Sequence, residues 1–388
     1  MRTLPPTLPV LLAAALLATP GTGAAQIKIG FINSITGPEA PIGENLTNGA
    51  ELAVEDLAKQ GIQVKLVKQD DTGKPDKAIA AIEQLATGDE VAAVVGPYTS
   101  ACANAVARQA EQYEIPELIP AAAKEEITRQ GYKWVFRVNA PAHGYAQSLI
   151  DAALGLGKPR TIAFIYESTD FGASVSDAGK KYAKAKGLTV VADEPYQKGA
   201  ADYRSTLTKI KALKPDLVFM VSYVADAILL MRQSREIGLH PQAFLGGGAG
   251  FDTAQFEKER DISTNVFSVT QWTPEVKNPG AAEFATRYVA RYGKKPSYHA
   301  ACSYAATMIA GEVAAKAGGD RAKIRAALAS GAWPTILGTV KFQDYDGFQG
   351  QNRLVMPVIQ YQDGKGVTVY PPSIAHHKPV YPFPGFAR

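Results

Sequence analysis

The 388-residue sequence has few of the residues that build metal and catalytic sites. It contains two cysteines and five histidines, with no paired spacing among them, so a structural zinc site is not expected. It has no Gly-x-Ser-x-Gly elbow, no phosphate-binding loop ending in Gly-Lys-Ser/Thr and no His-Glu-x-x-His pair. We therefore expect no metal, no cofactor and no catalytic residues, and we predict that the chain is not an enzyme.

Excess charge and long apolar runs are also lacking after the N-terminal segment. The chain has 41 basic and 37 acidic side chains, a net charge of +4, and no dense basic block. Proteins that bind nucleic acid by neutralising its backbone normally carry such a block, so no nucleic-acid partner is expected. No later run approaches the ~20 apolar residues that a spanning helix needs, so we predict that the body of the chain does not cross a membrane.

The first 25 residues have the pattern of a secretory signal peptide. Arg2 supplies a positive start, residues 8–18 are apolar, and Gly23 and Ala25 suit the −3 and −1 positions of a signal peptidase site. We predict cleavage near Ala25. No cysteine lies near this point, so a lipid anchor is not expected. The predicted destination is the bacterial periplasm, with full secretion as the alternative.

From residue 27 onward, short apolar runs alternate with longer helical patterns. The predicted strands are 27–32, 64–68, 91–95, 115–119, 161–165, 189–192, 217–221 and 243–245. The predicted helices between them are 43–60, 75–85, 101–113, 173–186, 203–212 and 225–236. Such alternation predicts an α/β protein whose parallel sheets carry helices on both faces.

Helices are expected again within residues 279–330, and strands at 338–342 and 354–360. This last part must be shared between the two preceding α/β blocks or form its own domain. We predict two doubly wound parallel-sheet lobes joined by a multi-strand hinge, with a ligand between them. Lobe 1 is predicted to contain 26–141 and 272–344, and lobe 2 to contain 142–271 and 345–388. The crossings predicted to form the hinge are Pro141, Gln271–Trp272 and Tyr345–Gly347.

Two features have more than one interpretation. The glycine cluster Gly246–Gly250 follows a predicted strand, but Phe251 and Asp252 break the dinucleotide-binding fingerprint, which favours a loop at the mouth of the cleft. Cys102 and Cys302 form a disulfide, as cysteine pairs in exported proteins often do, or remain two buried free thiols, with a catalytic thiol as the third alternative.

Several blocks of the sequence resemble the leucine/isoleucine/valine-binding proteins, the type I periplasmic solute receptors of ABC importers. They include IGFINSITGPEAPIGENLTNGAELAVEDL, VVGPYTSACANAVARQAEQYEIPELIPAAA and LKPDLVFMVSYVADAILLMRQSREIGL. The blocks occur in the family's order and cover nearly all of the chain after residue 25. The resemblance implies a clamshell fold, a small-molecule ligand, an ABC permease of the inner membrane as partner, and a monomer.

The resemblance also implies ligand-binding residues. Ser100 matches a serine that grips the ligand carboxylate, and its place at the start of a predicted helix suits an anion. Ala121 matches a position that binds through its backbone. The apolar and aromatic contacts that the resemblance implies are Ile42, Phe171, Tyr223 and His299.

Two positions depart from the family pattern. Ala123 stands where the amino-acid binders carry a threonine hydroxyl, and Gly248 stands where they carry the glutamate that takes the ammonium group. Asp226 or Asp252 could replace that glutamate. Otherwise a buried ammonium would lack a counter-charge, which is costly. Further aromatic walls are expected from Tyr166, Tyr196 and Trp272.

The predicted function is capture of a small carboxylate-bearing solute and its delivery to a permease. The ligand is an amino acid, or an aromatic or aliphatic acid or amide without the α-amine. One alternative is a sensing module of the same fold that feeds a regulator. Another is an exported α/β enzyme, which would need a nucleophile–base pair that the sequence does not offer.

Overall fold

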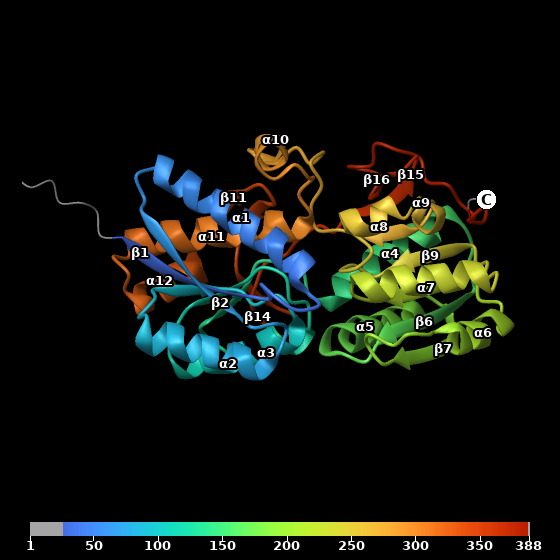
Figure 1. The fold of residues 1–388 in the computed structure, drawn as a ribbon, viewed down its shortest axis with the longest axis horizontal. Coiled ribbons are helices and arrows are strands. Elements are labelled where there is room, and N and C mark those ends of the chain that lie inside the picture. The colour runs from blue at the N-terminus through green and yellow to red at the C-terminus, as the bar shows by residue number, and fades with distance from the viewer. Residues whose placement is uncertain (1–25, 387–388) are drawn as a thin grey trace, which may run out of the picture.

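The computed structural model describes residues 26–386, so the predicted signal peptide lies outside the described residues. Two lobes are present, each built on a seven-stranded, mostly parallel sheet with helices on both faces (Figure 1). The predicted fold class is confirmed. None of the described helices combines the length and apolar character needed to cross a membrane.

Lobe 1 is built on the sheet that contains the first strand of the chain. Its strands, in spatial order, are β13 (Gln343–Tyr345), β14 (Phe348–Gln351), β5 (Val135–Arg137), β4 (Glu117–Ile119), β3 (Ala93–Val95), β1 (Ile27–Asn33) and β2 (Val64–Asp70). One face carries α1 (Ala40–Lys59) and α11 (Tyr298–Lys316), which pack on each other. The opposite face carries α2 (Pro75–Glu83) and α3 (Ser100–Gln112) (Figure 1). The remaining helical elements of this lobe are η1 (Gln84–Gly88), η2 (Glu125–Thr128), α10 (Ala281–Tyr292) and α12 (Arg321–Ser330).

Lobe 2 repeats this plan. Its strands, in spatial order, are β16 (Lys365–Tyr370), β15 (Val358–Gln362), β10 (Phe267–Val269), β9 (Ala243–Gly246), β8 (Leu217–Val221), β6 (Thr161–Glu167) and β7 (Thr189–Tyr196). One face packs against α4 (Ala142–Leu156) and α5 (Asp170–Ala185). The other face packs against α6 (Arg204–Ala212), α7 (Val224–Glu236), α8 (Ala254–Lys258) and α9 (Arg260–Ser263).

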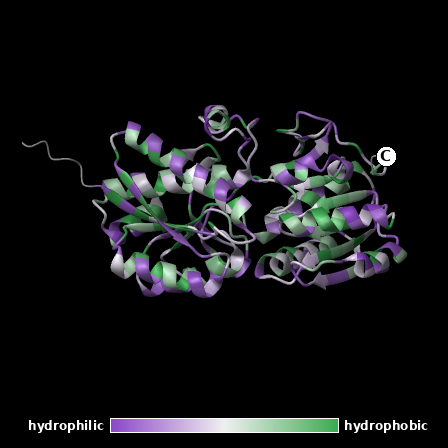
Figure 2. Cartoon of the chain, in the orientation of Figure 1, coloured by the Kyte–Doolittle hydropathy of each residue, from purple (hydrophilic) through white to green (hydrophobic). Residues whose placement is uncertain are grey.

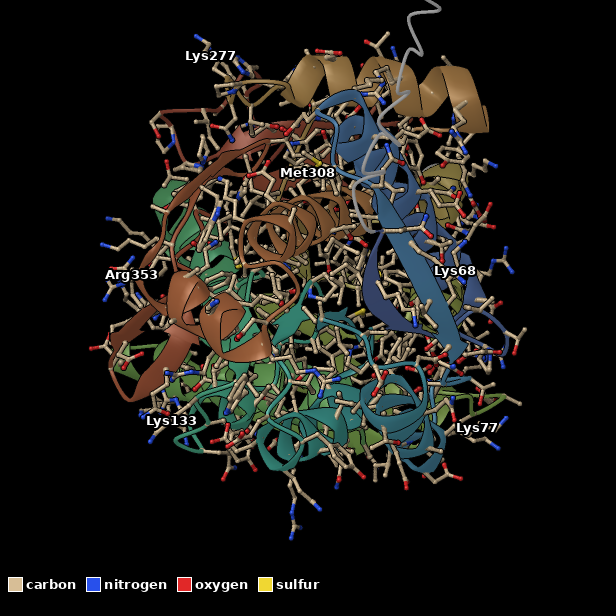
Figure 3. The ribbon with its side chains drawn as sticks, turned by 90° about the vertical axis from the view of Figure 1, so that its left-hand side faces the viewer. Lys68, Lys77, Lys133, Lys277, Met308 and Arg353 are labelled. Carbon is tan, nitrogen blue, oxygen red and sulfur yellow. The ribbon has the colours of Figure 1, made fainter. Side chains whose placement is uncertain are left out.

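The central strands of both sheets are apolar, whereas the covering helices turn polar faces outward (Figure 2). Strand β8 is buried at all five positions, as expected where helices cover both faces of a parallel sheet. In the end-on view of lobe 1, Met308 lies on α11 among the packed side chains (Figure 3). The lysines labelled there, Lys68, Lys77, Lys133 and Lys277, are exposed around the rim (Figure 3).

The chain passes between the lobes after β5, after β10 and after β14. The third crossing was predicted at Tyr345–Gly347, with lobe 2 resuming at residue 345, and this is wrong. Residues 346 and 347 form a two-residue turn between β13 and β14, with φ of 50° at Asp346 and 82° at Gly347, which suits a hairpin. Strand β14 still pairs with β5 of lobe 1, through Gln351 and Arg137. The crossing therefore lies at residues 352–357.

The predicted strand at 338–342 also differs. Strand β12 (Gly338–Val340) pairs with β11 (Trp333–Thr335) in a separate antiparallel hairpin and joins neither large sheet. Cys102 and Cys302 are both buried free thiols, on α3 and α11 respectively, so the disulfide alternative is ruled out. Burial raises the pKa of the Cys102 thiol to about 12, which keeps it protonated and unreactive at neutral pH.

Glu117 is a charged residue type in an apolar position. It lies on β4 between Val94 and Val135, is fully buried, and neither of its carboxyl oxygens has a hydrogen-bond partner among the described residues. Burial raises the pKa of Glu117 well above its usual value. Between the unfolded and folded pKa values the native state holds a proton that the unfolded chain has lost, so stability falls as pH rises above about 4.5.

We predict that Glu117→Gln changes stability little near pH 4.5 but stabilises the protein by about 1–3 kcal/mol at pH 7.5, because the amide cannot ionise. Urea unfolding across this pH range measures the difference. Glu117→Leu is the comparison variant and should stabilise at both pH values, because it removes the unpaired polar atoms altogether. If the difference in unfolding free energy between the wild type and Glu117→Gln did not change with pH, the raised pKa of Glu117 would be contradicted.

Candidate functional site

Six buried rings meet where the lobes face each other. Lobe 1 contributes Tyr98, Tyr298 and His299, and lobe 2 contributes Tyr145, Phe171 and Tyr223. We call these residues the interlobe aromatic cluster. Tyr98 follows β3, while Tyr298 and His299 begin α11. In lobe 2 the three rings lie at or near the starts of three different helices. Parallel strands place such loops and helix starts along the carboxyl edge of each sheet, where α/β proteins bind ligands.

The cluster closes on itself. The ring of Tyr98 makes edge contacts with Tyr223 at 5.8 Å and with His299 at 5.4 Å between centroids. Tyr223 contacts Phe171 at 5.6 Å, and Phe171 contacts Tyr145 at 6.1 Å. His299 stacks on Tyr298 at 3.9 Å, and the Tyr298 side chain interacts with that of Tyr145.

Two polar atoms of this cluster are buried without a hydrogen-bond partner among the described residues: the hydroxyl of Tyr98 and Nδ1 of His299. Burial lowers the pKa of His299 to about 3, so its ring is neutral at physiological pH. Unpaired buried polar atoms are rare, and at an interface between lobes they are groups that a ligand could satisfy. The cluster therefore offers apolar walls together with neutral polar atoms.

Ser100 lies at the start of α3, two residues beyond Tyr98. Its Oγ accepts hydrogen bonds from the backbone N–H groups of Ala123 and Lys124, both at 3.2 Å. No hydrogen bond donated by this hydroxyl occurs among the residues that the structure describes, and none there uses the N–H of Ala121. The Ser100 hydroxyl can thus donate to an acceptor, and the helix N-terminus beside it favours an anion.

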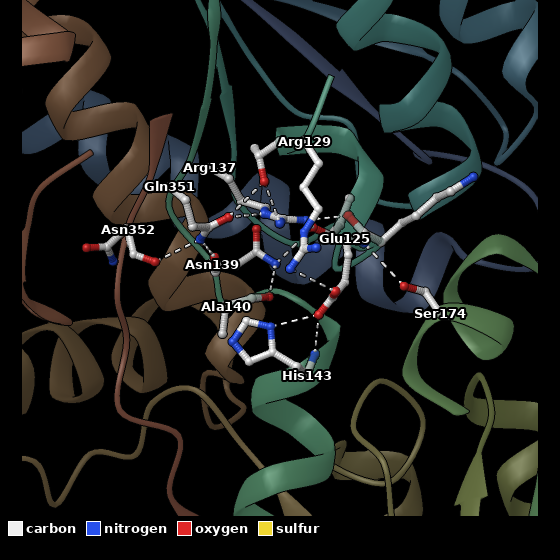
Figure 4. Close-up of polar contacts among 12 residues, drawn as sticks. Glu125, Arg129, Arg137, Asn139, Ala140, His143, Ser174, Gln351 and Asn352 are labelled. Carbon is white, nitrogen blue, oxygen red and sulfur yellow. Dashed lines mark hydrogen bonds and ion pairs between the residues drawn. The ribbon is translucent and has the colours of Figure 1, made fainter. Parts of the chain in front are cut away.

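The loop that carries Ala121, Ala123 and Lys124 is held by the buried side chain of Arg137 (Figure 4). The guanidinium donates to the carbonyl of Lys124 at 2.6 Å and to Oε1 of Gln351 at 2.5 Å. Burial lowers the pKa of Arg137 to about 10, so it stays charged at neutral pH. Gln351 in turn donates to the carbonyls of Asn139 and Asn352, each at 2.8 Å. The hydrogen bonds of Arg137 and Gln351 thus connect the loop that contains Lys124 with the first and third crossings.

Polar contacts also join the lobes directly. Glu39, at the N-terminus of α1, pairs with Lys198 of lobe 2, whose Nζ lies 4.4 Å from the centre of the Tyr223 ring. Lys124 pairs with Asp170 at 3.0 Å. Ser174 of α5 accepts a hydrogen bond from the N–H of Glu125 at 3.2 Å, a contact that crosses between the lobes in Figure 4.

Gly248 lies against the ring of Tyr145. Its φ of +89° is a conformation that suits glycine, and a Cβ built there would lie 2.4 Å from Cε1 of Tyr145. Gly250 is similarly confined, because its Cβ would lie 2.5 Å from the carbonyl oxygen of Tyr223. The glycine-rich segment 246–250 is therefore a tight loop between β9 and α8, and it packs against Tyr145 and Tyr223 of the interlobe aromatic cluster.

The acidic side chains near the cluster all have partners. Glu39 pairs with Lys198, and Asp226 accepts from the N–H of Gly199 at 3.0 Å. Glu167 accepts from the Thr169 hydroxyl at 2.7 Å and from the N–H of Tyr223 at 3.0 Å. Burial raises the pKa of Glu167 to about 8, so its carboxyl is largely neutral at pH 7.

Thr270 lies beside Asp252, and burial raises the pKa of Asp252 to about 7. Asp226 is thus engaged by a backbone N–H, and Asp252 is only partly ionised at neutral pH. Among the described residues, no group of three or more His, Cys, Asp or Glu side chains could hold a metal ion.

The structure brings most of the predicted site residues to the interface. Phe171, Tyr223 and His299 belong to the cluster, Gly248 touches Tyr145, and Ser100 contacts the loop of Ala121 and Ala123. Ile42 is buried in the first turn of α1, three residues after Glu39.

Three other predicted aromatic walls lie outside the cluster. Tyr196 packs on Tyr203 at 4.6 Å and donates to Ser222 at 2.7 Å, within the second core of lobe 2. Tyr166 lies under Lys180 of α5. Trp272 lies on the second crossing and packs edge-on against Phe284 at 5.6 Å. Their strand and linker positions turn these rings toward other neighbours.

Sequence reasoning missed Tyr98, Tyr145 and Tyr298. Tyr98 and Tyr298 each lie within two residues of a predicted site residue, Ser100 and His299, which is a usable signal. Nothing in the sequence links Tyr145 to Gly248, because their contact forms only when α4 packs beside the loop after β9.

Comparisons with known proteins agree with this architecture. A family model described as "Periplasmic binding protein" matches residues 26–365. The chain is 32% identical to Leu/Ile/Val-binding protein homolog 7 of Brucella suis biovar 1, covering 93% of this chain and 96% of that protein.

Two solved structures have the same fold. The leucine-binding protein LivK from Thermotoga maritima matches with a TM-score of 0.81 and 24% identity, covering 89% of this chain and 98% of that one. A solute-binding protein of an ABC transporter from R. palustris, in complex with benzoate, matches with a TM-score of 0.78 and 22% identity, covering 89% and 95%.

The interlobe ion pair generates a prediction. Lys198→Met should leave Glu39 buried without its counter-charge and lower the free energy of unfolding at pH 7.5 by about 1–3 kcal/mol. Burial already raises the pKa of Glu39, so the loss should shrink toward pH 4.5, where the carboxyl takes up a proton. Urea unfolding at the two pH values measures the effect.

The matched control is Lys124→Met, because the Lys124–Asp170 pair is more exposed and should contribute less than about 1 kcal/mol. Equal losses in the two variants, or a Lys198→Met loss that is independent of pH, would refute the role assigned to the buried pair.

Proposed function

Because this chain belongs to the periplasmic binding protein family, we propose that it is the exported substrate-binding receptor of an ABC importer, and that it works in the periplasm with a permease of the inner membrane. It is a solute-binding protein and not an enzyme, as its relatives' names and fold indicate. Residues 1–25 serve in this proposal as a signal peptide removed near Ala25.

The proposed ligand is a small carboxylate whose body is aromatic or branched aliphatic and which lacks an α-amine. The observation that carries this proposal is Ser100: its hydroxyl has accepted two backbone N–H groups and keeps its own proton for an acidic ligand. The aromatic cluster beside it suits an apolar body. Glu39 is already paired with Lys198 and Glu167 is largely neutral, so neither offers a free counter-charge to an α-ammonium.

In this mechanism the ligand contacts both lobes and thereby favours the closed arrangement. Lobe 1 would hold the carboxylate at Ser100 and Ala121, while Phe171 and Tyr223 of lobe 2 close over the body of the ligand. The three crossings would serve as the hinge, with small changes at residues 138–141, 270–273 and 352–357. A closed, loaded receptor then presents one shape to the permease.

The first experiment is a thermal-shift screen of residues 26–388 with leucine, isoleucine, valine, small amides, benzoate and phenylacrylate. A ligand at about 1,000 times its Kd adds roughly 4 kcal/mol of stability and should raise Tm by several degrees. We expect shifts with the acids and none with the amino acids. A shift with leucine but not with benzoate would overturn the proposed ligand class.

A second test uses Ser100→Ala. With the acid that gives the largest shift, its Kd by calorimetry should rise about 10- to 100-fold, because a hydrogen bond to a charged group is lost. Ser303→Ala is the control: its Oγ donates to the carbonyl of Leu46 at 2.7 Å inside lobe 1, so affinity should not change. Unchanged affinity in Ser100→Ala would remove Ser100 from the site.

A further inference from the structure

The volume beside residue 248 is already occupied. A Cβ at this position would lie 2.4 Å from Cε1 and 2.6 Å from Cδ1 of Tyr145, closer than Cβ atoms approach other atoms. No side chain can therefore project from residue 248 while the Tyr145 ring keeps its place. The surface of lobe 2 here is made by a residue of α4, although residue 248 lies in the loop that follows β9.

Tyr145 is held firmly in that place. Its hydroxyl accepts a hydrogen bond from Nε2 of Gln271 at 2.5 Å, and Oε1 of the same amide accepts from the N–H of Ala140 at 2.8 Å. The ring is buried, packs edge-on against Phe171, and interacts with Tyr298 of lobe 1. Moving the ring aside would cost these contacts together, so the ring is a fixed part of the wall.

We infer that Tyr145 is a specificity-determining residue: it takes the place of a side chain at residue 248 and gives the interface a neutral aromatic wall that excludes ligands with an ammonium group. This inference rests on the proposed function, which it deepens by naming the residue that sets the ligand class. Glycine at 248 is then required both by its positive φ and by the ring beside it, and adding an acidic side chain at 248 is insufficient to admit an amino acid.

An aromatic wall could in principle attract a cation through its ring faces. In this cluster, however, Lys198 already lies 4.4 Å from the centre of the Tyr223 ring. Lys198 already occupies that ring face, and its pairing with Glu39 leaves the Glu39 carboxylate no free charge for a second cation. The carboxyl of Glu167 does not compensate, because it is engaged by Thr169 and by the N–H of Tyr223. The wall therefore favours neutral, flat or branched groups.

The test compares leucine and benzoate binding by calorimetry in the wild type, Gly248→Glu, Tyr145→Ala and the double variant. We expect no measurable leucine binding in either single variant and measurable leucine binding in the double variant. Tyr145→Phe combined with Gly248→Glu is the matched control. It keeps the ring and should bind leucine no better than Gly248→Glu alone. Leucine binding in Gly248→Glu that equals binding in the double variant would overturn the inference.

A stability cycle tests the inference even if the glutamate variants fail to fold. Gly248→Ala should lower Tm in the wild-type background and should lower it less in the Tyr145→Ala background, because the colliding ring is then absent. Equal Tm losses in both backgrounds would show that the ring does not occupy the space beside residue 248. If the wild type binds none of the screened acids, the proposed ligand class fails, while this cycle still decides whether Tyr145 occupies that space.

Discussion

A single buried charge organises the contact region of the two lobes. The guanidinium of Arg137 is fully buried, and its hydrogen bonds go to backbone carbonyls, a hydroxyl and an amide oxygen of the protein. A buried charge without such partners would be strongly destabilising, so these groups must stay where the charge needs them. They belong to the loop that contacts Ser100, to η2 and to the strand before the third crossing. The geometry of the loop that contacts Ser100 thus depends on the same side chain that connects the crossings.

Around the loop that Arg137 holds, the two lobes meet through two kinds of contact. Aromatic pairs supply burial and contribute about 0.5–1.5 kcal/mol each beyond their area, with loose directional demands. The Glu39–Lys198 and Lys124–Asp170 pairs and the Ser174 hydrogen bond supply direction and register. In the proposed mechanism, a ligand that enters between the lobes would replace part of the aromatic contact with its own. A flat or branched apolar group would lose the least van der Waals contact, because it can pack against the rings of both lobes.

The architecture was largely predictable because buried parallel strands and amphipathic helices have strong patterns in the sequence. The misses follow from weak or misleading patterns. Strand β5 has only three residues, so its apolar run is too short to stand out in the sequence. The turn at Asp346 and Gly347 has the composition of a linker as well as of a hairpin. Only the pairing of Gln351 with Arg137 shows that the chain remains in lobe 1 there.

The sequence by itself determined the α/β class, the two lobes, the family, and the positions of Ser100, Tyr223, Phe171 and His299 at the ends of strands or the starts of helices. Those features are local or are carried by contiguous motifs. Only the tertiary structure decided what fills the space at Gly248, since Tyr145 lies about a hundred residues away in the chain and on another helix. It also decided that Glu39 is paired with Lys198 and that Asp226 accepts a backbone N–H, because these contacts depend on which loops meet when the chain packs.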